Sequence, residues 1–173
     1  LDLKFHDIPH TVASAVTAAC ELGVWMLTVH VQGGREMLCA ARAAIDAFSG
    51  RKPMLVGVTV LTSLCEDDLT KMGILQPMDQ VVLNYAEMAC QARLDGVVCS
   101  SQEAMLLKQR YQDALLLVTP GIRLQGDNAS DQKRVLTPKA AQQAGADYLV
   151  IGRSITQAKQ PAVALQTCLL ELS

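Results

Sequence analysis

The first eleven residues, LDLKFHDIPHT, carry the side chains best suited to chemistry. Side chains alternate along a strand with a period of two, so a strand at this point would place Asp2 and Lys4 on one face. A nearby carboxylate favours the ammonium form of a lysine. One interpretation is a proton donor held by acidic neighbours. The other is a buried structural ion pair, with Asp7 as the N-cap of a helix entered through Pro9. The spacing alone leaves both open.

Two histidines in the same stretch, His6 and His10, have the i, i+4 spacing of a metal-binding pair. No acidic or cysteine partner stands nearby in a recognised pattern, and Pro9 lies between them at a helix start. We therefore predict solvated or hydrogen-bonding histidines and no metal site.

A second candidate site is YLVIGRSITQA, in which an apolar strand passes through Gly152 into a helix that should begin near Ser154 or Thr156. Backbone N–H groups at such a start, together with the Arg153 guanidinium, would bind a phosphate. An ordinary strand-to-helix turn has the same residues, so the turn alone does not decide between the two readings.

The third candidate is the long connection from Pro120 to about Leu136, which is longer than most strand-to-helix loops. It is rich in Gly, Asp, Asn and Ser, and it holds four side chains that could reach an anionic ligand: Arg123, Gln125, Gln132 and Lys133. Long polar loops beside a site often act as lids that exclude water. A disordered insertion is the alternative.

These residues must be positioned by the elements around them. Continuous runs of Val, Leu and Ile predict strands buried on both faces, as in a parallel sheet. Amphipathic stretches between the runs predict covering helices. In three junctions a helix ends, passes through Gly23, Gly96 or Gly145 as a left-handed C-cap, and enters a strand. The predicted strands are Leu1–Lys4, Val24–His30, Met54–Leu61, Gly96–Cys99, Leu115–Pro120 and Tyr148–Gly152.

Repetition of a strand-helix unit predicts an α/β fold, and we favour a (β/α)8 TIM barrel over a doubly wound sheet. No GxGxxG turn follows any strand. Polar or special residues stand where strands end, and barrel enzymes build their sites there. These residues are Asp2, Lys4, His30, Thr59, Thr62, Ser100, Thr119, Pro120, Gly152 and Arg153.

The number of units is too small for a closed barrel. We count about six strand-helix units where eight are needed. The chain also begins inside a predicted strand, so we expect two N-terminal units to be absent from it. YLVIG then becomes the eighth strand and LLLVTP the seventh, and barrels often bind phosphate after these two strands. We expect residues 1–173 to form a single domain, the C-terminal three quarters of a barrel.

Composition limits the class of protein. The 173 residues are 50% hydrophobic and 3% aromatic, with a net charge of -2. The sequence has no stripe of basic residues interleaved with aromatic ones, which argues against a nucleic-acid partner. No apolar run reaches the length of a membrane span. Six cysteines lie apart from one another without a CxxC pair. We expect reduced thiols and a cytoplasmic protein.

Several segments together resemble one enzyme family. LDLKFHDIPHT fits the pattern D-x-K-x-x-D-I-P-x-T, and VTVLTS, DGVVCS, VTPGIR, DQKR and VIGRSIT follow in the same order as the later blocks of that family. The chain is therefore similar to the orotidine 5'-monophosphate decarboxylases, most of all to bacterial ones. The similarity covers essentially the whole sequence.

The resemblance implies a barrel enzyme that converts orotidine 5'-monophosphate to uridine 5'-monophosphate in pyrimidine biosynthesis without a cofactor. Lys4 would protonate C6 of the pyrimidine, and Asp2 would lie beside the substrate carboxylate and hold Lys4. The family forms homodimers with shared active sites. The remaining matching positions are Asp7, Ile8 and Thr11, which would reach into the partner's site, Thr62 at the pyrimidine, Arg123 and Gln132 in the closing loop, and Gly152 and Arg153 at the phosphate.

One departure and two alternatives follow. The family's charged array is Lys-Asp-Lys-Asp, whereas this sequence supplies only Asp2, Lys4 and Asp7 and also lacks an aspartate of the first strand. We therefore expect residues 1–173 alone to be inactive and poorly folded, with exposed strand edges.

One alternative is a magnesium-dependent sister enzyme with D-x-K-x-x-D, a keto-gulonate phosphate decarboxylase or a hexulose-phosphate synthase, although I-P-x-T and VTPGIR favour the nucleotide enzyme. The other is a non-catalytic phosphate-binding fragment.

Overall fold

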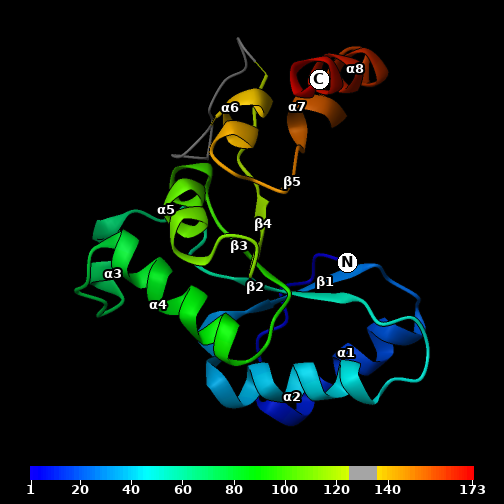
Figure 1. The fold of residues 1–173 in the computed structure, drawn as a ribbon, viewed down its shortest axis with the longest axis vertical. Helices are drawn as coiled ribbons and strands as arrows, with labels where there is room; N and C mark the ends of the chain where they lie inside the picture. Colours follow the sequence, from blue (N-terminus) through cyan, green and yellow to red (C-terminus); the bar gives the residue numbers. More distant parts are fainter. Residues whose placement is uncertain (125–135) are drawn as a thin grey trace.

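The computed structural model describes residues 1–124 and 136–173 as a parallel sheet with helices on its outer side (Figure 1). The strands are β1 (Met26–His30), β2 (Met54–Val58), β3 (Gly96–Val98), β4 (Leu116–Thr119) and β5 (Tyr148–Leu149). The helices are α1 (Pro9–Glu21), the 3-10 turn η1 (Val31–Gly33), α2 (Gly34–Ala47), α3 (Glu66–Lys71), α4 (Met78–Gln91), α5 (Ser101–Tyr111), α6 (Pro138–Gln143), α7 (Arg153–Thr156) and α8 (Pro161–Leu172).

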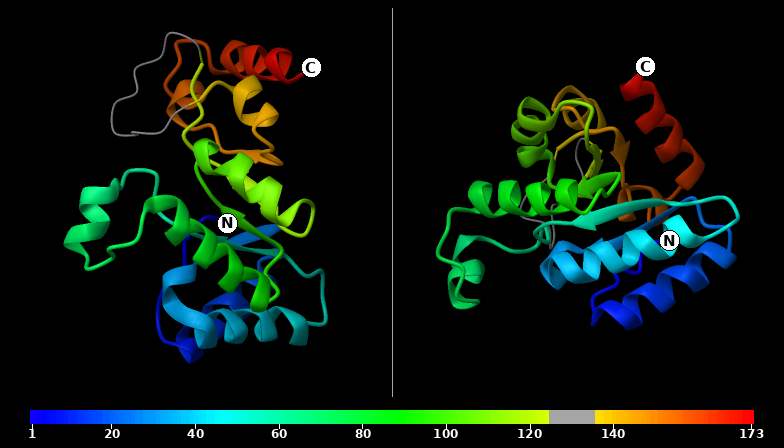
Figure 2. Two further views of the ribbon diagram at one scale, coloured as in Figure 1. Left: turned by 60° about the vertical axis from the view of Figure 1, so that its left-hand side comes forward. Right: turned by 60° about the horizontal axis from the view of Figure 1, so that its bottom comes forward.

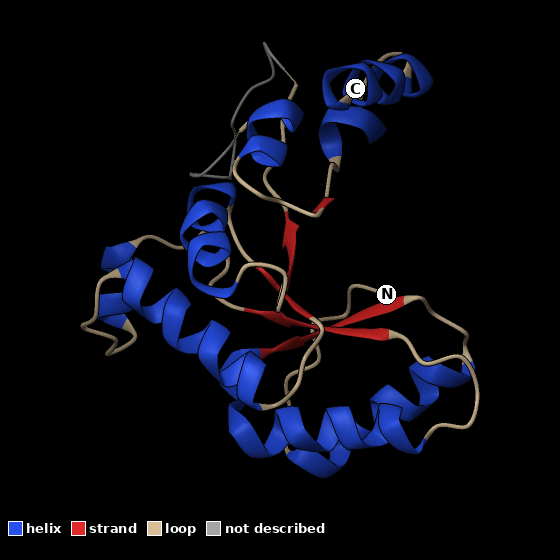
Figure 3. Cartoon of the chain, viewed as in Figure 1, coloured by secondary structure: helices blue, strands red, loops and turns tan. Residues whose placement is uncertain are grey.

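The five strands pair in chain order, β1-β2-β3-β4-β5, and every pair is parallel. They fan around a common centre while the helices stay on the outside (Figure 3). This is the curved arrangement of a barrel wall, and it places the carboxyl ends of all strands at one rim. The predicted alternation of strands and helices is therefore confirmed.

Apolar residues fill the layer between the sheet and its helices. The strand residues Leu27, Val29 and Leu55 are inaccessible to solvent, as are Leu38 of α2 and Val82 of α4. Strands buried on both faces need continuous apolar sequence, which explains why their positions are legible in the sequence. Within the described residues, no helix combines the length and the apolar character needed to cross a bilayer.

The predicted first strand is wrong. Residues 1–4 are not in a strand, and only Phe5 forms an isolated parallel bridge, with Val29 of β1. The Phe5 amide donates to the Thr28 carbonyl (3.0 Å), and the His30 amide donates to the Phe5 carbonyl (2.9 Å). Lys4 has a φ of 51°, a left-handed conformation that interrupts an extended backbone. The other five predicted strands are present, each shorter than predicted, and β5 is reduced to two residues.

Two of the three predicted glycine caps are confirmed. Gly23 and Gly145 follow α1 and α6 with φ of 68° and 100°. Gly96 is not a cap, because it lies inside β3, and Arg93 takes the left-handed conformation after α4 instead, with φ of 56°. The absence of a side chain at Gly96 serves a close approach of strands, since a Cβ there would lie 2.4 Å from the Leu116 carbonyl oxygen.

Two aspartates that the sequence patterns do not single out extend the hydrogen bonding of the sheet at the amino ends of its strands. Asp95 precedes β3 and accepts the Leu55 amide at 2.7 Å, and Asp147 precedes β5 and accepts the Leu117 amide at 2.7 Å. In turn, the Asp95 amide donates to the Leu55 carbonyl and the Asp147 amide donates to the Leu117 carbonyl, both at 2.9 Å. A carboxylate thus replaces a missing strand residue at each position.

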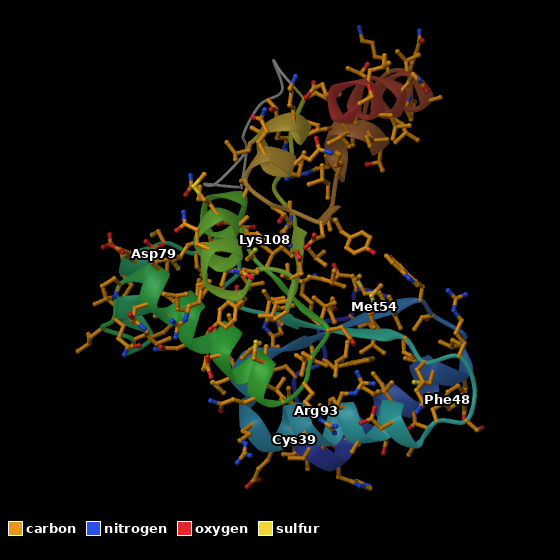
Figure 4. The ribbon with its side chains drawn as sticks, in the orientation of Figure 1. Cys39, Phe48, Met54, Asp79, Arg93 and Lys108 are labelled. Atoms are coloured by element: carbon orange, nitrogen blue, oxygen red, sulfur yellow. The ribbon has the colours of Figure 1, made fainter. Side chains whose placement is uncertain are left out.

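A basic side chain neutralises each of these carboxylates. Arg42 of α2 lies 3.1 Å from Asp95, and Lys108 of α5 lies 3.1 Å from Asp147. Figure 4 shows Lys108 on α5 and Arg93 above α2, where Arg93 pairs with Asp46 at 3.4 Å. These ion pairs tie the helices to the strand beginnings, at the end of the sheet opposite the rim.

Candidate active site

The centre of the candidate site is the pair formed by Asp2 and Lys4. The Lys4 Nζ lies 2.7 Å from Asp2 Oδ2, and the two side chains are 36% and 59% exposed, Lys4 and Asp2 respectively. Among the described residues, the Asp2–Lys4 pair is therefore accessible to solvent, and the alternative of a buried structural ion pair is wrong. It forms although the segment is not a strand and Lys4 has a left-handed backbone conformation.

A third residue completes this cluster. The Thr28 hydroxyl on β1 donates to Asp2 Oδ1 (2.9 Å) and accepts the Lys4 amide (3.0 Å). Sequence reasoning missed Thr28, because a threonine inside an apolar strand resembles ordinary core. Its polarity among Val and Leu neighbours is the one signal that could have pointed to it.

The cluster lines a cavity of about 220 Å³ on the inner side of the sheet. The rest of the lining is apolar: Leu1, Trp25, Met26, Val98, Val118, Pro120 and Val150. The charged pair thus lies against an apolar wall on one side and is accessible to solvent on the other. A larger hollow of about 360 Å³ between β5, α7 and α8 holds none of the predicted site residues.

Two titratable groups at this site are shifted. Partial burial raises the pKa of Asp2, but hydrogen bonds from Lys4 and Thr28 and the charge of Lys4 outweigh it, so the pKa is lowered overall. Asp2 is therefore ionised at neutral pH. At the end of β1, desolvation and then the charges of His6 and Lys4 lower the pKa of His30. The His30 ring stands 5.2 Å from the His6 ring, centroid to centroid.

The residues predicted to serve a second subunit lie at the start of α1. Asp7, Ile8 and Thr11 are exposed, with Ile8 at 66%, and none of them lines the cavity. The N-cap position belongs to Ile8, and no side chain caps the helix. Asp7 instead accepts the Ile8 amide at 2.6 Å, so its predicted capping role is wrong. Pro9 does occupy the first turn of the helix, as predicted.

The predicted phosphate residues stand at the end of the sheet formed by β5. Gly152 is the N-cap of α7, which begins at Arg153, one residue before the predicted start. Arg153 is exposed, and the space where a Gly152 side chain would lie is open to 4 Å. The turn therefore presents accessible backbone beside a guanidinium group.

The long connection after β4 is described at both ends. Arg123 is buried, 8% exposed, and its Nη1 donates to the Ile122 carbonyl at 2.9 Å. The Arg123 amide donates to the Leu136 carbonyl at 3.0 Å, so the two ends of the connection meet. Gln132, Gln125 and Lys133 lie outside the described residues.

Thr62 lies in the loop after β2, half-buried in a turn that leads to α3. Both views of Figure 2 show α3 extending away from the sheet. Thr62 does not line the cavity that Asp2 and Lys4 share. Among the residues placed in the structure, no three His, Cys, Asp or Glu side chains are grouped so as to hold a metal ion.

Comparison with known proteins decides the family. The model described as "Orotidine 5'-phosphate decarboxylase / HUMPS family" matches residues 1–168. The chain belongs to this family. The resemblance expected from the sequence motifs is thereby confirmed, and five strands of the family's TIM barrel are present among the described residues.

Relatives in this decarboxylase family are similar over almost the whole chain. Orotidine 5'-phosphate decarboxylase of Pseudoalteromonas translucida is 54% identical over 165 residues, which cover 95% of this chain and 70% of the relative. The enzyme of that name from Pseudomonas aeruginosa PAO1 is 54% identical over 173 residues, covering 99% and 74%. The chain thus spans about 70% to 74% of the length of these relatives.

Solved structures of the family superpose well. The crystal structure of orotidine 5'-phosphate decarboxylase from Lactobacillus acidophilus has a TM-score of 0.86 and 37% identity, and the match covers 100% of this chain and 74% of that one. The corresponding structure from Pyrococcus horikoshii has a TM-score of 0.73 at 23% identity, covering 99% and 72%, and supports the fold alone.

Proposed function

We propose that this protein decarboxylates orotidine 5'-monophosphate to uridine 5'-monophosphate in pyrimidine biosynthesis, with Lys4 as the proton donor and without a metal or organic cofactor. The single observation that carries the mechanism is the Lys4 ammonium, 2.7 Å from an ionised Asp2 and facing a largely apolar cavity. The family match and the names of the 54% identical relatives support the reaction.

The chemistry explains why a lysine beside a carboxylate suits this reaction. When the bond between C6 and the carboxylate breaks, carbon dioxide leaves and the electron pair stays on C6 as a carbanion that the ring π system does not delocalise. A fixed ammonium group stabilises that developing negative charge electrostatically. The proton then passes from Lys4 Nζ to C6, which leaves a neutral amine that solvent reprotonates. Asp2 orients the ammonium group throughout.

Phosphate binding would supply energy away from the reacting carbon. Gly152 and Arg153 present accessible backbone and a guanidinium group, and Arg123 stands where the long connection leaves the sheet. In our proposal these residues and Gln132 hold the phosphate under a closing loop, and Thr62 contacts the pyrimidine. Remote binding energy then favours the closed, reactive complex over the open one.

We also propose a homodimer with shared sites, located in the cytoplasm. Asp7, Ile8 and Thr11 are exposed and absent from the lining of their own cavity, which suits residues that complete a partner's site. An isoleucine that is 66% exposed beside a charged cluster also suits an interface. The six cysteines are free thiols, which suits a reducing compartment.

The decisive experiment is Lys4→Ala in the full-length polypeptide, assayed by the ultraviolet absorbance change on decarboxylation. We expect turnover to fall by at least about 100-fold, the scale of losing a positioned proton donor. Binding of the product nucleotide, measured by calorimetry, should remain largely in place. The matched control is Lys139→Ala, an exposed lysine on α6, which should behave as the wild type. Unchanged turnover in Lys4→Ala would refute the proposal.

A chelator distinguishes the sister enzymes that share D-x-K-x-x-D, since the family description also includes HUMPS. EDTA should leave decarboxylation of the nucleotide intact. Activity on a sugar phosphate that EDTA abolishes would favour the magnesium-dependent alternative instead.

A further inference from the structure

The hydroxyl of Thr28 forms hydrogen bonds with both members of the charged pair, to the Asp2 carboxylate and to the Lys4 amide. Thr28 lies on β1, is 6% exposed, and lines the same cavity as Asp2 and Lys4. We infer that Thr28 is a positioning residue that sets the orientation of Asp2 and Lys4 for proton transfer. This inference rests on the function proposed above.

The first argument comes from the backbone of Lys4. Its φ of 51° is uncommon for a residue with a side chain and persists only where the surroundings hold it. Thr28 stabilises this backbone conformation by accepting hydrogen bonds from two successive amides. The Thr28 hydroxyl accepts the Lys4 amide at 3.0 Å, and the Thr28 carbonyl accepts the Phe5 amide at 3.0 Å. The left-handed turn at Lys4, whose ammonium group binds Asp2, is thus held against β1.

The second argument comes from the carboxylate of Asp2. Its Oδ2 receives the Lys4 ammonium at 2.7 Å, and its Oδ1 receives the Thr28 hydroxyl at 2.9 Å. With one donor on each oxygen, the plane of the carboxylate cannot rotate freely. A hydroxyl has a single proton to donate and two lone pairs that can accept. The Thr28 hydroxyl donates that proton to Asp2, and one of its lone pairs accepts the Lys4 amide. The two hydrogen bonds therefore fit together in direction.

The third argument is the rigidity of the support. Thr28 pairs with Val56 in the β1–β2 ladder, and its neighbours Leu27 and Val29 are fully buried. A β-branched side chain has few accessible rotamers, so the hydroxyl has a defined position. The Asp2 side chain, 59% exposed, has no comparable support of its own. Sites held by such elements are more accurately positioned than sites on loops alone.

The test compares Thr28→Val, which replaces the hydroxyl by a methyl group, with Thr28→Ser, which keeps it. In the full-length polypeptide we expect Thr28→Val to lower kcat by roughly 10- to 100-fold, the scale of losing one hydrogen bond to a charged group. KM should stay within about twofold, since Thr28 is not proposed to bind substrate. Thr28→Ser should restore most of kcat. If Thr28→Val does not fold, Thr28→Ala supplies the same comparison.

The pH profile separates positioning from mere stability. The Thr28 hydrogen bond favours the ionised form of Asp2, so its loss should raise the pKa of Asp2 and move the acid limb of the kcat profile to higher pH. Thr28→Ser should return the limb to its wild-type position. An unchanged kcat and acid limb in Thr28→Val would overturn the inference, as would a Thr28→Ser variant as impaired as Thr28→Val.

A readout without turnover keeps the two proposals distinguishable. Carbon-13 NMR of the Asp2 carboxylate should show a higher pKa in Thr28→Val than in the wild type, and the wild-type value in Thr28→Ser. If the wild type fails to decarboxylate the nucleotide, the proposed function is wrong, whereas the NMR titration still decides whether Thr28 controls the charged pair. No difference among the three titrations would refute the role of Thr28.

Discussion

Gly96→Ala gives the sharpest test of how closely the strands approach one another. A Cβ built at this position would lie 2.4 Å from the Leu116 carbonyl oxygen and 2.8 Å from the Leu116 Cβ. Ordinary contact begins near 3.4 Å, so the added carbon is about 1 Å too close to the backbone of β4. That backbone has little freedom, because Leu116 also donates its amide to the Asp95 carbonyl at 3.1 Å.

The expected cost follows from overpacking against a fixed partner. Forcing an extra carbon into a packed interior typically costs about 1–3 kcal/mol. The alanine also restricts the unfolded chain, which returns about 0.4–1 kcal/mol. Because the obstacle is backbone, we expect a net loss of about 2 kcal/mol in the free energy of unfolding. For a protein of this size that corresponds to a fall in Tm of about 4–8 °C.

The assay is urea denaturation of the full-length polypeptide, followed by circular dichroism, with a thermal scan alongside. Gly57→Ala in the neighbouring strand β2 is the matched control. A Cβ there would meet the Val31 Cγ2 at 2.7 Å and the Leu94 Cδ2 at 2.9 Å, which are side-chain methyl groups and not backbone atoms. Gly57→Ala should therefore also destabilise the protein, but less than Gly96→Ala. Equal midpoints for Gly96→Ala and the wild type, or equal losses in both variants, would refute the reasoning.

Two further predictions concern charged groups. Asp147→Ala should lower the free energy of unfolding by about 1–2 kcal/mol, because it removes the acceptor of the Leu117 amide and a partner of Lys108. Asp113→Ala removes a fully exposed carboxylate 3.6 Å from the same lysine and should leave the free energy of unfolding unchanged within error. Comparable losses in the two variants would contradict the ladder role of Asp147. Burial and nearby positive charge lower the folded pKa of His30 from 6.5, so this residue's contribution to stability is complete above pH 6.5 and is lost as the pH falls below it. In urea titrations at several pH values, His30→Asn should flatten that acid-side loss, whereas the same loss in His30→Asn and the wild type would show that His30 does not cause it.

The sequence by itself determined the class of fold and the family. Buried parallel strands need continuous apolar runs, so five strands could be located from local composition. Left-handed caps at Gly23 and Gly145 were legible because glycine adopts a positive φ without the steric cost that a side chain brings, whereas the left-handed Arg93 after α4 carried no such signal. The motif beginning at Asp2 pointed to the family that the comparison confirms.

What the sequence could not supply depended on contacts between distant segments. The left-handed turn at Lys4 exists because β1 holds two of its amides, and pairing of that kind leaves no mark on the pattern of residues 1–4. Gly96 looked like a helix cap, yet its need for a missing side chain comes from the approach of β4, some twenty residues further on.

The same reason explains the residues that were overlooked. Asp95 and Asp147 accept amides 40 and 30 residues before them, and Thr28 reaches Asp2 across 26 residues. Side-chain hydrogen bonds of this range require a particular register between elements, and register is set by packing of the whole sheet. The sequence therefore determined which residues could carry charge and chemistry, whereas the tertiary structure decided which of them meet and in what orientation.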